Sequence, residues 1–331
     1  MERLIKIGKI KPRKASEIKN SRIGIGFEKL DRKVFNPEKA YDKLAMIGAK
    51  WVRIQSGWER TEQEKGVYDF EWLDSIVDNL LERGLVPWIN LAYGNGLYDD
   101  DAAKVFGAVG CPPVKSEEAK KGWADYITAL AAHMKGRISY YEVWNEPDGE
   151  WKHGPNGKEY GQFVVDTSVA LKKGDSSAKV IGGAICMAKP LDFAYDAFSV
   201  GMGEHIDAIS FHEYVIDETV VFRHVKALRG LCNRFNPNIE IIQGESGSQS
   251  RSDGRGAMRK GAWTPHKQAK QLLRHLMADL MTEVKFTSYF SCMDMIEALN
   301  GTVGDLVSYL DYGYFGVLGA AFTALIRCII P

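Results

Sequence analysis

Two glutamates stand at the ends of short apolar runs and could form a catalytic pair. Glu146 lies in the segment 141–147 (YEVWNEP), and Glu245 lies in the segment 243–247 (QGESG). Cleavage of a glycosidic bond needs two carboxyl groups. One protonates the leaving oxygen, and the other attacks the anomeric carbon or activates a water molecule. If the fold brings these two side chains together, the chain carries the groups for that reaction.

The elements that must position the glutamates can be predicted from hydrophobic patterning. Short β-branched runs alternate with polar loops and with segments whose apolar residues recur at helical spacing. The predicted strands are 23–27, 51–55, 85–91, 138–145, 179–185, 206–212, 239–244 and 285–291. Alternating strands and helices predict a parallel sheet, and eight such units predict the α/β class with a closed (β/α)8 TIM barrel.

Helix starts between these strands support the alternation. Asn36-Pro37 and Thr264-Pro265 each combine an N-cap residue with proline at the first helical position. The segment 69–84 places its apolar residues on one stripe, as a helix packed against a barrel requires. The last unit is the least regular, because its apolar segment 308–330 is interrupted by glycines.

The barrel prediction makes the two glutamates more informative. Active sites of such barrels lie at the carboxyl ends of the strands. Glu146 ends the fourth predicted strand and Glu245 ends the seventh. Strands four and seven face each other across the barrel mouth, so we expect the two carboxyl groups to flank one sugar.

The Trp-Asn-Glu-Pro segment at residues 144–147, together with a second glutamate closing the seventh strand, resembles clan A of the glycoside hydrolases. From Ile23 to the eighth strand, the chain is most similar to family 39, the β-xylosidase and α-L-iduronidase group. The resemblance implies a retaining double displacement, with Glu146 as acid/base and Glu245 as nucleophile. It also implies that Asn145 hydrogen-bonds the sugar 2-hydroxyl.

The resemblance further implies a set of groups around the nucleophile. Arg53 on the second strand is the candidate cation, and His212 with Tyr214 is similar to the His-x-Tyr pair of the clan, with Tyr214 donating to Glu245. The nucleophile must stay ionised, whereas the acid needs a raised pKa. Structural alternatives remain open: Arg53 can neutralise Glu142, and His212 can be a buried core histidine.

Aromatic and amide side chains near strand ends are candidates for contacts with a sugar ring. Many clan members end the eighth strand with tryptophan, whereas here Phe290 occupies that place, which leaves the family-level substrate open. The candidate sugar-binding residues, beyond those named above, are Trp58, Asn90, Trp144, Trp151, Trp263 and Phe290, with Tyr93 and Tyr98 as further aromatic candidates. Each of these rings has packing as its alternative role.

The amino-acid composition limits which other classes of function need to be considered. The chain has 331 residues, of which 45% are hydrophobic and 26% charged, as in globular proteins. Lys+Arg and Asp+Glu both number 43, so the formal net charge is zero. The absence of a net positive charge argues against nucleic acid as a partner. We expect a segment 1–20 before the barrel and one catalytic barrel over 21–331.

No apolar run reaches the length of a membrane span, and no signal-peptide core stands at the start, so we expect no membrane partner. The expected location is the cytoplasm, or outside the cell with a signal removed. The sequence carries no signature of an oligomeric interface.

Metal and cofactor motifs are missing. The five cysteines show no CxxC spacing and the seven histidines do not cluster at ligand spacing, so we expect no metal and no cofactor. A carbohydrate substrate is expected. The sugar identity depends on the loops 92–116 and 246–264; the second contains Arg251, Arg255, Arg259 and Lys260, which suit either an acidic sugar or solvent. The alternative functions are a sugar-binding barrel without turnover and a transglycosylase using the same residues.

Overall fold

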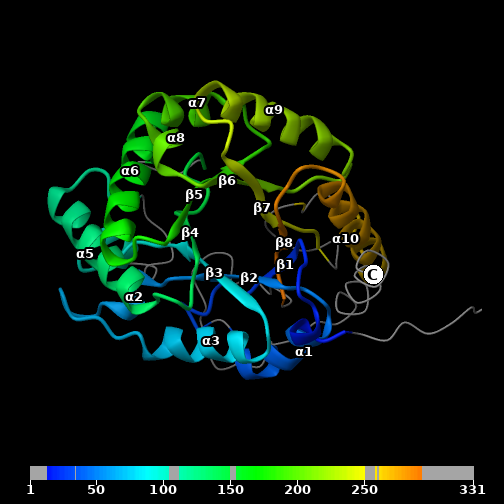
Figure 1. The fold of residues 1–331 in the computed structure, drawn as a ribbon, viewed down its shortest axis with the longest axis horizontal. Coiled ribbons are helices and arrows are strands. Elements are labelled where there is room, and N and C mark those ends of the chain that lie inside the picture. Colours follow the sequence, from blue (N-terminus) through cyan, green and yellow to red (C-terminus); the bar gives the residue numbers. More distant parts are fainter. Residues whose placement is uncertain are drawn as a thin grey trace, which may run out of the picture.

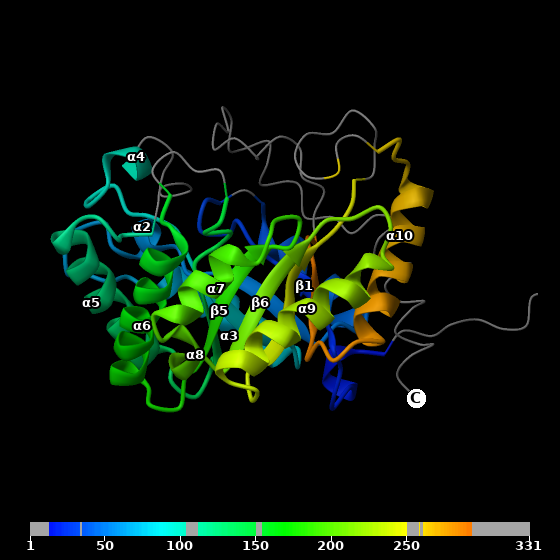
Figure 2. The same cartoon turned by 90° about the horizontal axis from the view of Figure 1, so that it is seen from above.

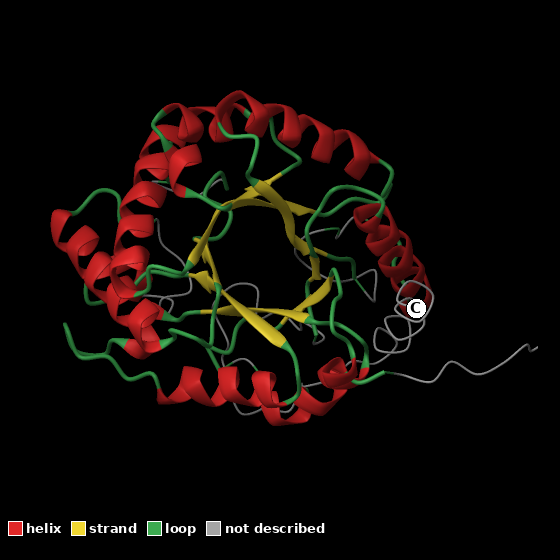
Figure 3. Ribbon diagram, in the orientation of Figure 1, coloured by secondary structure: helices red, strands yellow, loops and turns green. Residues whose placement is uncertain are grey.

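The computed structural model describes residues 13–33, 35–103, 112–149, 154–249, 258 and 261–292. Eight parallel strands close into a barrel in which each strand pairs with its neighbours in chain order, and β8 returns to β1 (Figure 1, Figure 3). This confirms the predicted TIM barrel. The strands are β1 Ile23–Gly26, β2 Trp51–Gln55, β3 Val86–Leu91, β4 Tyr140–Val143, β5 Lys179–Cys186, β6 Ala208–Glu213, β7 Glu240–Ser246 and β8 Thr287–Tyr289.

Helices surround this barrel on its outer face (Figure 3). They are α1 Tyr41–Met46, α2 Trp58–Thr61, α3 Glu71–Glu82, α4 Asp100–Ala103, α5 Glu117–His133, α6 Gly157–Gly174, α7 Asp192–Ser199, α8 Met202–His205, α9 Val220–Phe235 and α10 Pro265–Leu280, with 3-10 helices η1 Ala15–Glu17 and η2 Pro37–Lys39. The Thr264 hydroxyl accepts from the Lys267 N–H and starts α10 as predicted. Asn36 caps η2 instead, and α1 follows it directly.

The N-terminal segment packs under the barrel. Ala15 and Ile18 are buried, and Lys50 Nζ donates to the Ala15 carbonyl at 3.0 Å. In the side view, this dark-blue segment lies at the lower edge, whereas α4, which follows β3, lies at the upper edge (Figure 2). Ala15 and Ile18 therefore anchor residues 13–20 to the amino-terminal end of the barrel, while most other side chains of the segment are exposed. Residues 1–12 and the apolar segment 308–330 of the last predicted unit fall outside the described residues.

The interior of the barrel at its amino-terminal end is filled by a cluster that we call the apolar plug. Its members, each from a different strand or the start of one, are Trp88, Tyr140, Ile181, Ala208, Ile242 and Phe286. Phe286 stacks on Trp51 with ring centroids 4.3 Å apart and meets Trp88 edge-on at 5.3 Å. A barrel filled in this way is a packed core and not a pore.

Two strands contain one more residue than their neighbours across the same stretch. In β7, Gln243 pairs with Phe211 and Glu245 pairs with His212, so Gly244 is the extra residue. In β5, three steps from Gly182 to Ile185 match two steps on β6. Such bulges redirect the side chains that follow them.

Among the described residues, no helix is long and apolar enough to cross a membrane. Cys186, Cys232 and Cys292 are free thiols, and Cys111 and Cys328 lie outside the described residues.

Candidate active site

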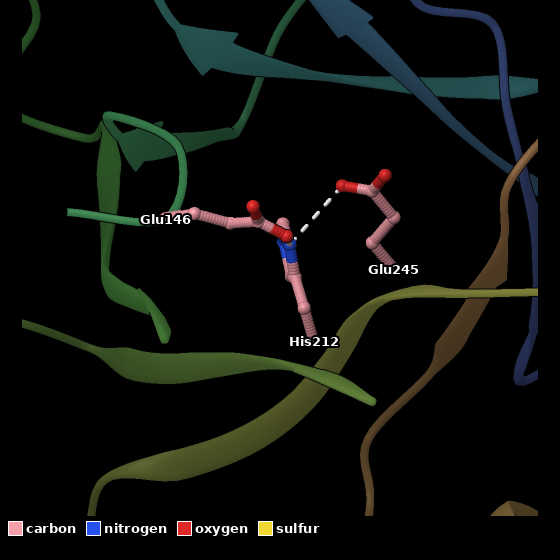
Figure 4. Close-up of side chains that lie close together, drawn as sticks. All are labelled: Glu146, His212 and Glu245. Carbon is pink, nitrogen blue, oxygen red and sulfur yellow. Dashed lines mark hydrogen bonds and ion pairs between the residues drawn. The ribbon is translucent and has the colours of Figure 1, made fainter. Parts of the chain in front are cut away.

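The fold brings Glu146 and Glu245 together at the carboxyl ends of the strands. One oxygen of each carboxylate lies within 4.8 Å of the other. The His212 ring stands beside both, with Nδ1 at 3.1 Å from Glu146 Oε1 and 3.1 Å from Glu245 Oε2 (Figure 4). Two side chains that are distant in the sequence thus face one common space.

Local backbone strain directs Glu146 into that space. Trp144 and Glu146 both adopt left-handed conformations, with φ of 67° and 47°. The Glu146 N–H donates to the carbonyl of Ala184 in the β5 bulge at 3.1 Å, and Asn90 Nδ2 donates to the Trp144 carbonyl at 2.5 Å. Non-glycine residues persist in such conformations where the surroundings fix them, which is frequent at functional sites.

The β7 bulge performs the same task for Glu245. Ile242 points inward in the apolar plug, so strict alternation would direct Gly244 inward and Glu245 outward. The extra residue shifts this pattern by one, and Glu245 reaches the interior. A Cβ on Gly244 would lie 2.9 Å from Glu142 Oε1, so any other residue here would require the Glu142 carboxylate to move.

Arg53 is the centre of a buried group of charges that we call the carboxylate cluster, formed with Glu28, Glu142 and Glu245. Its Nη2 donates to Glu142 at 2.5 Å, and its Nη1 donates to Glu28 at 3.2 Å and to Glu245 at 3.3 Å. Nη2 also donates to Asn145 Oδ1 at 2.9 Å. Arg53 therefore neutralises Glu142 and also contacts the predicted nucleophile.

The cluster fixes the charge state of its members. Burial alone would lower the pKa of Arg53, but the carboxylates of Glu142, Glu245 and Glu28 outweigh it and raise the pKa above its ordinary value. Burial raises the pKa of Glu28 to about 7, against the charge of Arg53. Arg53 therefore stays charged, whereas Glu28 exchanges its proton near neutral pH.

Tyr214 and His212 hold the predicted nucleophile from the other side. Tyr214 Oη donates to Glu245 Oε1 at 2.6 Å, as expected. Burial would lower the pKa of His212, but the carboxylates of Glu245 and Glu146 outweigh it and raise the pKa above its ordinary value. His212 is a fully enclosed imidazole between two acids, which combines the core position and the site position that the sequence left open.

Glu146 differs from expectation in its ionisation. A raised pKa is expected for a general acid, and burial does act in that direction. The hydrogen bond from His212, followed by the charges of His212 and Arg53, outweighs burial and holds the pKa of Glu146 below its ordinary value. The two pKa shifts thus favour the same arrangement, a protonated His212 beside an ionised Glu146.

Two other predicted residues lie close to these groups. Asn90 is buried and donates to Glu142 Oε2 at 2.9 Å, so it orients the cluster from below. Phe290 follows β8, its N–H donates to the Ser246 carbonyl, and its ring faces Lys29 Nζ at 5.8 Å. Phe290 thus stands beside the strand end that carries Glu245.

The predicted tryptophans are not free platforms. Trp58 is buried in the outer layer, stacked on Tyr98 and Tyr126, because Gly57 in a left-handed conformation turns the chain into α2. Trp144 is buried with its ring edge-on to Trp123. Trp263 is also buried, donates to the Met258 carbonyl and lies under Lys267. Trp151 and the arginines of the loop 246–264 fall outside the described residues.

Sequence reasoning missed Glu28 and Lys29 as site residues. Both follow β1 at its carboxyl end, so the same filter that selected Glu146 and Glu245 could have found them. No motif identifies these two residues, because their position depends on a turn that no sequence pattern here predicts.

Glu146, His212 and Glu245 also have the residue types of a metal site. The contacts of His212 Nδ1 with both carboxylates, at 3.1 Å, are hydrogen-bond distances. A zinc ion would need this nitrogen at about 2.0–2.1 Å and unoccupied by a proton. The arrangement therefore fits a proton between two acids better than a metal ligand set.

The sequence of the barrel matches a known family. The family model of glycosyl hydrolases family 39 matches residues 37–228. The chain belongs to glycosyl hydrolases family 39. The matched region contains Arg53, Glu146, His212 and Tyr214, whereas Glu245 lies beyond it.

Curated relatives of this family 39 chain are β-xylosidases. The chain is 30% identical over 189 residues to a β-xylosidase of Caldicellulosiruptor saccharolyticus, covering 52% of this chain and 38% of that protein. It is 29% identical over 163 residues to a β-xylosidase of Geobacillus stearothermophilus, covering 45% of this chain and 31% of that protein. The matches thus span about a third of each relative.

Solved structures share the barrel. A family 39 glycoside hydrolase from Bacteroides cellulosilyticus WH2 superposes with a TM-score of 0.66 at 17% identity, covering 92% of this chain and 64% of that one. Xylanase 10B from Thermotoga petrophila RKU-1 superposes with a TM-score of 0.65 at 15% identity, covering 97% and 99%. At these identities the superpositions support the fold.

Proposed function

We propose that this chain is a retaining glycoside hydrolase acting on a β-linked sugar, with Glu245 as nucleophile and Glu146 as general acid/base. The observation that carries the proposal is the spacing of the two carboxylates, whose nearest ligand oxygens lie within 4.8 Å of each other. Retaining enzymes hold their carboxyl groups about 5–5.5 Å apart, and inverting enzymes about 6.5–9.5 Å apart to admit a water molecule. The short spacing supports direct attack by Glu245.

In the first step a Glu245 oxygen attacks the anomeric carbon, and the bond from that carbon to the leaving oxygen breaks. The leaving oxygen takes a proton from Glu146, so the products are a glycosyl ester on Glu245 and an alcohol. Arg53 and Tyr214 keep Glu245 ionised, because each donates a hydrogen bond to its carboxylate.

The proton for this step is available across the contact between His212 and Glu146. A protonated His212 beside an ionised Glu146 holds as many protons as a neutral His212 beside a protonated Glu146. A sugar that fills the site excludes water, which destabilises the charged forms and favours the neutral pair. The proton then needs to move only along the contact of 3.1 Å.

In the second step water attacks the anomeric carbon and transfers a proton to Glu146. The ester bond to Glu245 breaks, and its carboxylate returns to Arg53 and Tyr214. Esterification removes the negative charge of Glu245 while the intermediate lasts. Glu146 therefore faces one charge fewer when it has to act as base.

The experiment uses 2,4-dinitrophenyl 2-deoxy-2-fluoro-β-D-xyloside, since the curated relatives are β-xylosidases. A burst of one dinitrophenolate per chain and a mass increase on the peptide carrying Glu245 are expected. NMR of 4-nitrophenyl β-D-xyloside hydrolysis should show β-xylose as the first product, and dialysis against EDTA should not change the rate. Release of α-xylose first would contradict the retaining mechanism; transfer to added alcohols without hydrolysis would indicate a transglycosylase.

A further inference from the structure

The turn after β1 carries two adjacent charged side chains that the proposed mechanism does not use. Phe27 N–H still pairs with the Arg53 carbonyl at 2.8 Å, and Lys29 N–H donates to Gln55 Oε1 at 3.0 Å. Lys29 then adopts a left-handed conformation with φ of 75°. Glu28 and Lys29 are thus fixed in a strained turn at the carboxyl end of the barrel, beside the predicted nucleophile.

Glu28 is a buried acid for which the last residue of its own strand, Gly26, leaves space. Its side chain folds back over Gly26, where a Cβ would lie 2.1 Å from Glu28 Oε2. Oε1 accepts from Arg53, and among the described residues Oε2 has no hydrogen-bond partner. A buried acceptor without a donor is costly, so an oxygen in this position is suited to accept from a bound molecule.

Lys29, the next residue on this turn, is a largely buried cation. Only 7% of its surface is exposed, and within the described part of the chain its ammonium makes no hydrogen bond or ion pair. Its Nζ lies 5.8 Å from the centre of the Phe290 ring. Burial lowers the pKa of Lys29 to about 8, which leaves it mostly protonated at neutral pH. Arg32, on the same turn, differs because Asp31 and Gln55 already bind it.

We infer that Lys29 and Glu28 form a recognition pair for two adjacent hydroxyl groups of the sugar held at Glu245. Lys29 Nζ donates to one hydroxyl, and Glu28 Oε2 accepts from the next. The assignment rests on the proposed function, because it places the sugar between Glu245 and Phe290. The resemblance assigns the 2-hydroxyl to Asn145, so the pair would take the hydroxyls at positions 3 and 4.

The charges around this pair select a neutral sugar. A hexuronate carboxylate next to Lys29 would also lie near Glu28 and Glu245, both of which influence the Lys29 ammonium electrostatically. The cations there are Lys29 and Arg32. They face Glu245, Asp31 and the partly ionised Glu28, so a further carboxylate finds no excess of positive charge. A diol matches one donor and one acceptor without adding charge, so the site favours a neutral pyranoside over a uronide.

The test compares hydroxyl deletion with side-chain replacement. The wild type and the variants Lys29→Met and Glu28→Gln are assayed with 4-nitrophenyl β-D-xyloside and with its 3-deoxy and 4-deoxy forms. Each deletion should reduce kcat/KM of the wild type by about 10- to 100-fold, as for loss of one hydrogen bond to a charged group. For the parent xyloside, Lys29→Met should reduce kcat/KM by a similar factor. In this variant, removal of one of the two sugar hydroxyls should then cause no further loss of kcat/KM. Lys33→Met, which replaces an exposed lysine, is the matched control and should behave as the wild type.

Additive losses from substitution and deoxygenation would assign the pair a structural role and overturn the inference. A wild type that prefers 4-nitrophenyl β-D-glucuronide, with the preference lost in Lys29→Met, would overturn it in favour of a uronate site. Titration calorimetry with phenyl 1-thio-β-D-xyloside, which is not cleaved, separates this inference from the proposed function. Binding that weakens in Lys29→Met without any turnover would retain the pair and refute the hydrolase. Turnover and binding that are both unaffected by either substitution would retain the hydrolase and refute the pair.

Discussion

The two ends of the barrel interior are built from opposite chemistry on the same strands. On β4, Tyr140 belongs to the apolar plug and Glu142, two residues later on the same face, belongs to the carboxylate cluster. On β3, Trp88 of the plug is followed by Asn90, which donates to that cluster. The Arg53 guanidinium lies between the two ends, 5.6 Å from the Trp88 ring.

This difference separates stability from chemistry within one core. Burying aromatic and aliphatic side chains in the plug stabilises the fold in proportion to the area removed from water. Burying one arginine among three carboxyl groups has a large desolvation cost, and such groups are seldom a net source of stability. The amino-terminal end therefore holds the barrel together, and the carboxyl-terminal end is free to be arranged for a substrate.

The strongest test of this division is removal of the predicted nucleophile. Glu245→Ala should lower kcat/KM by on the order of 10⁴-fold or more, because no group remains to form the glycosyl ester. Its thermal midpoint should be equal to or above that of the wild type, since one of three acids around Arg53 is gone. Azide should restore turnover with the inverted product. Glu240→Ala, at the opposite end of β7, is the control; a similar loss of rate there would break the comparison.

Removal of the predicted general acid should have a smaller effect, which depends on the leaving group. Glu146→Ala should reduce hydrolysis of xylobiose by about 10²- to 10⁴-fold, the usual contribution of a positioned acid. Substrates with a dinitrophenolate leaving group need little protonation and should be affected much less in the first step. Steady-state rates across a series of aryl xylosides would measure this, and equal losses across the series would contradict the assignment.

A substitution in the apolar plug should lower the stability of the fold and leave the catalytic rate nearly unchanged. Phe286→Ala removes the ring that stacks on Trp51 and should lower the free energy of unfolding by about 3–5 kcal/mol. At temperatures where the variant is folded, kcat should remain within a few-fold of the wild-type value. Denaturant titration and kinetics on one preparation give both quantities. A large loss of kcat with unchanged stability would show that the two ends are not independent.

The smallest effect concerns a buried acid outside both regions. Asp279 on α10 accepts from Thr287 Oγ1 at 2.5 Å, and burial raises its pKa to about 8. Its ordinary pKa is about 4, so the unfolded chain releases this proton at lower pH than the folded one. Stability from this group is therefore complete below pH about 4 and is lost as pH rises towards 8.

Asp279→Asn keeps an acceptor for Thr287 and removes the titration. Relative to the wild type, the variant should gain stability between pH 5 and 8, by an amount on the order of a few kcal/mol at most. Thermal midpoints of both proteins across this range would show it. A constant difference between them would mean that Asp279 is ionised in the folded protein, stabilised as the carboxylates of the cluster are by Arg53.

Most of the fold and the centre of the site could be predicted from the sequence. All eight predicted strands occur, because β-branched runs separated by helical stripes have few other arrangements. The position of Glu146 and Glu245 at strand ends followed from the barrel itself. Trp58 also follows a strand, but the left-handed Gly57 turns it into the outer layer, and no pattern of residue types distinguishes that outcome.

The surroundings of Glu28 and the ionisation of Glu146 could not be predicted, for a different reason. Both depend on groups that meet only in three dimensions: Gly26 makes space for the Glu28 carboxylate, and His212 from β6 supplies the charge beside Glu146. Spacing along a chain gives the types of residue at a site, whereas pKa values depend on the distances among them.

The extra residues in β5 and β7 have a consequence for any attempt to simplify this barrel. Deleting Gly244 would give β7 the same number of residues as its two neighbours and an uninterrupted ladder, which is the more regular sheet. Glu245 would then directly follow Gln243 and would still point into the barrel, because alternate residues of a strand face the same side. Glu245 would point to the surrounding helices only if Gly244 were kept and paired with His212 in a regular ladder. The irregular pairing thus allows β7 to include a glycine next to Glu142 and still direct Glu245 into the barrel, where we propose that it attacks the sugar.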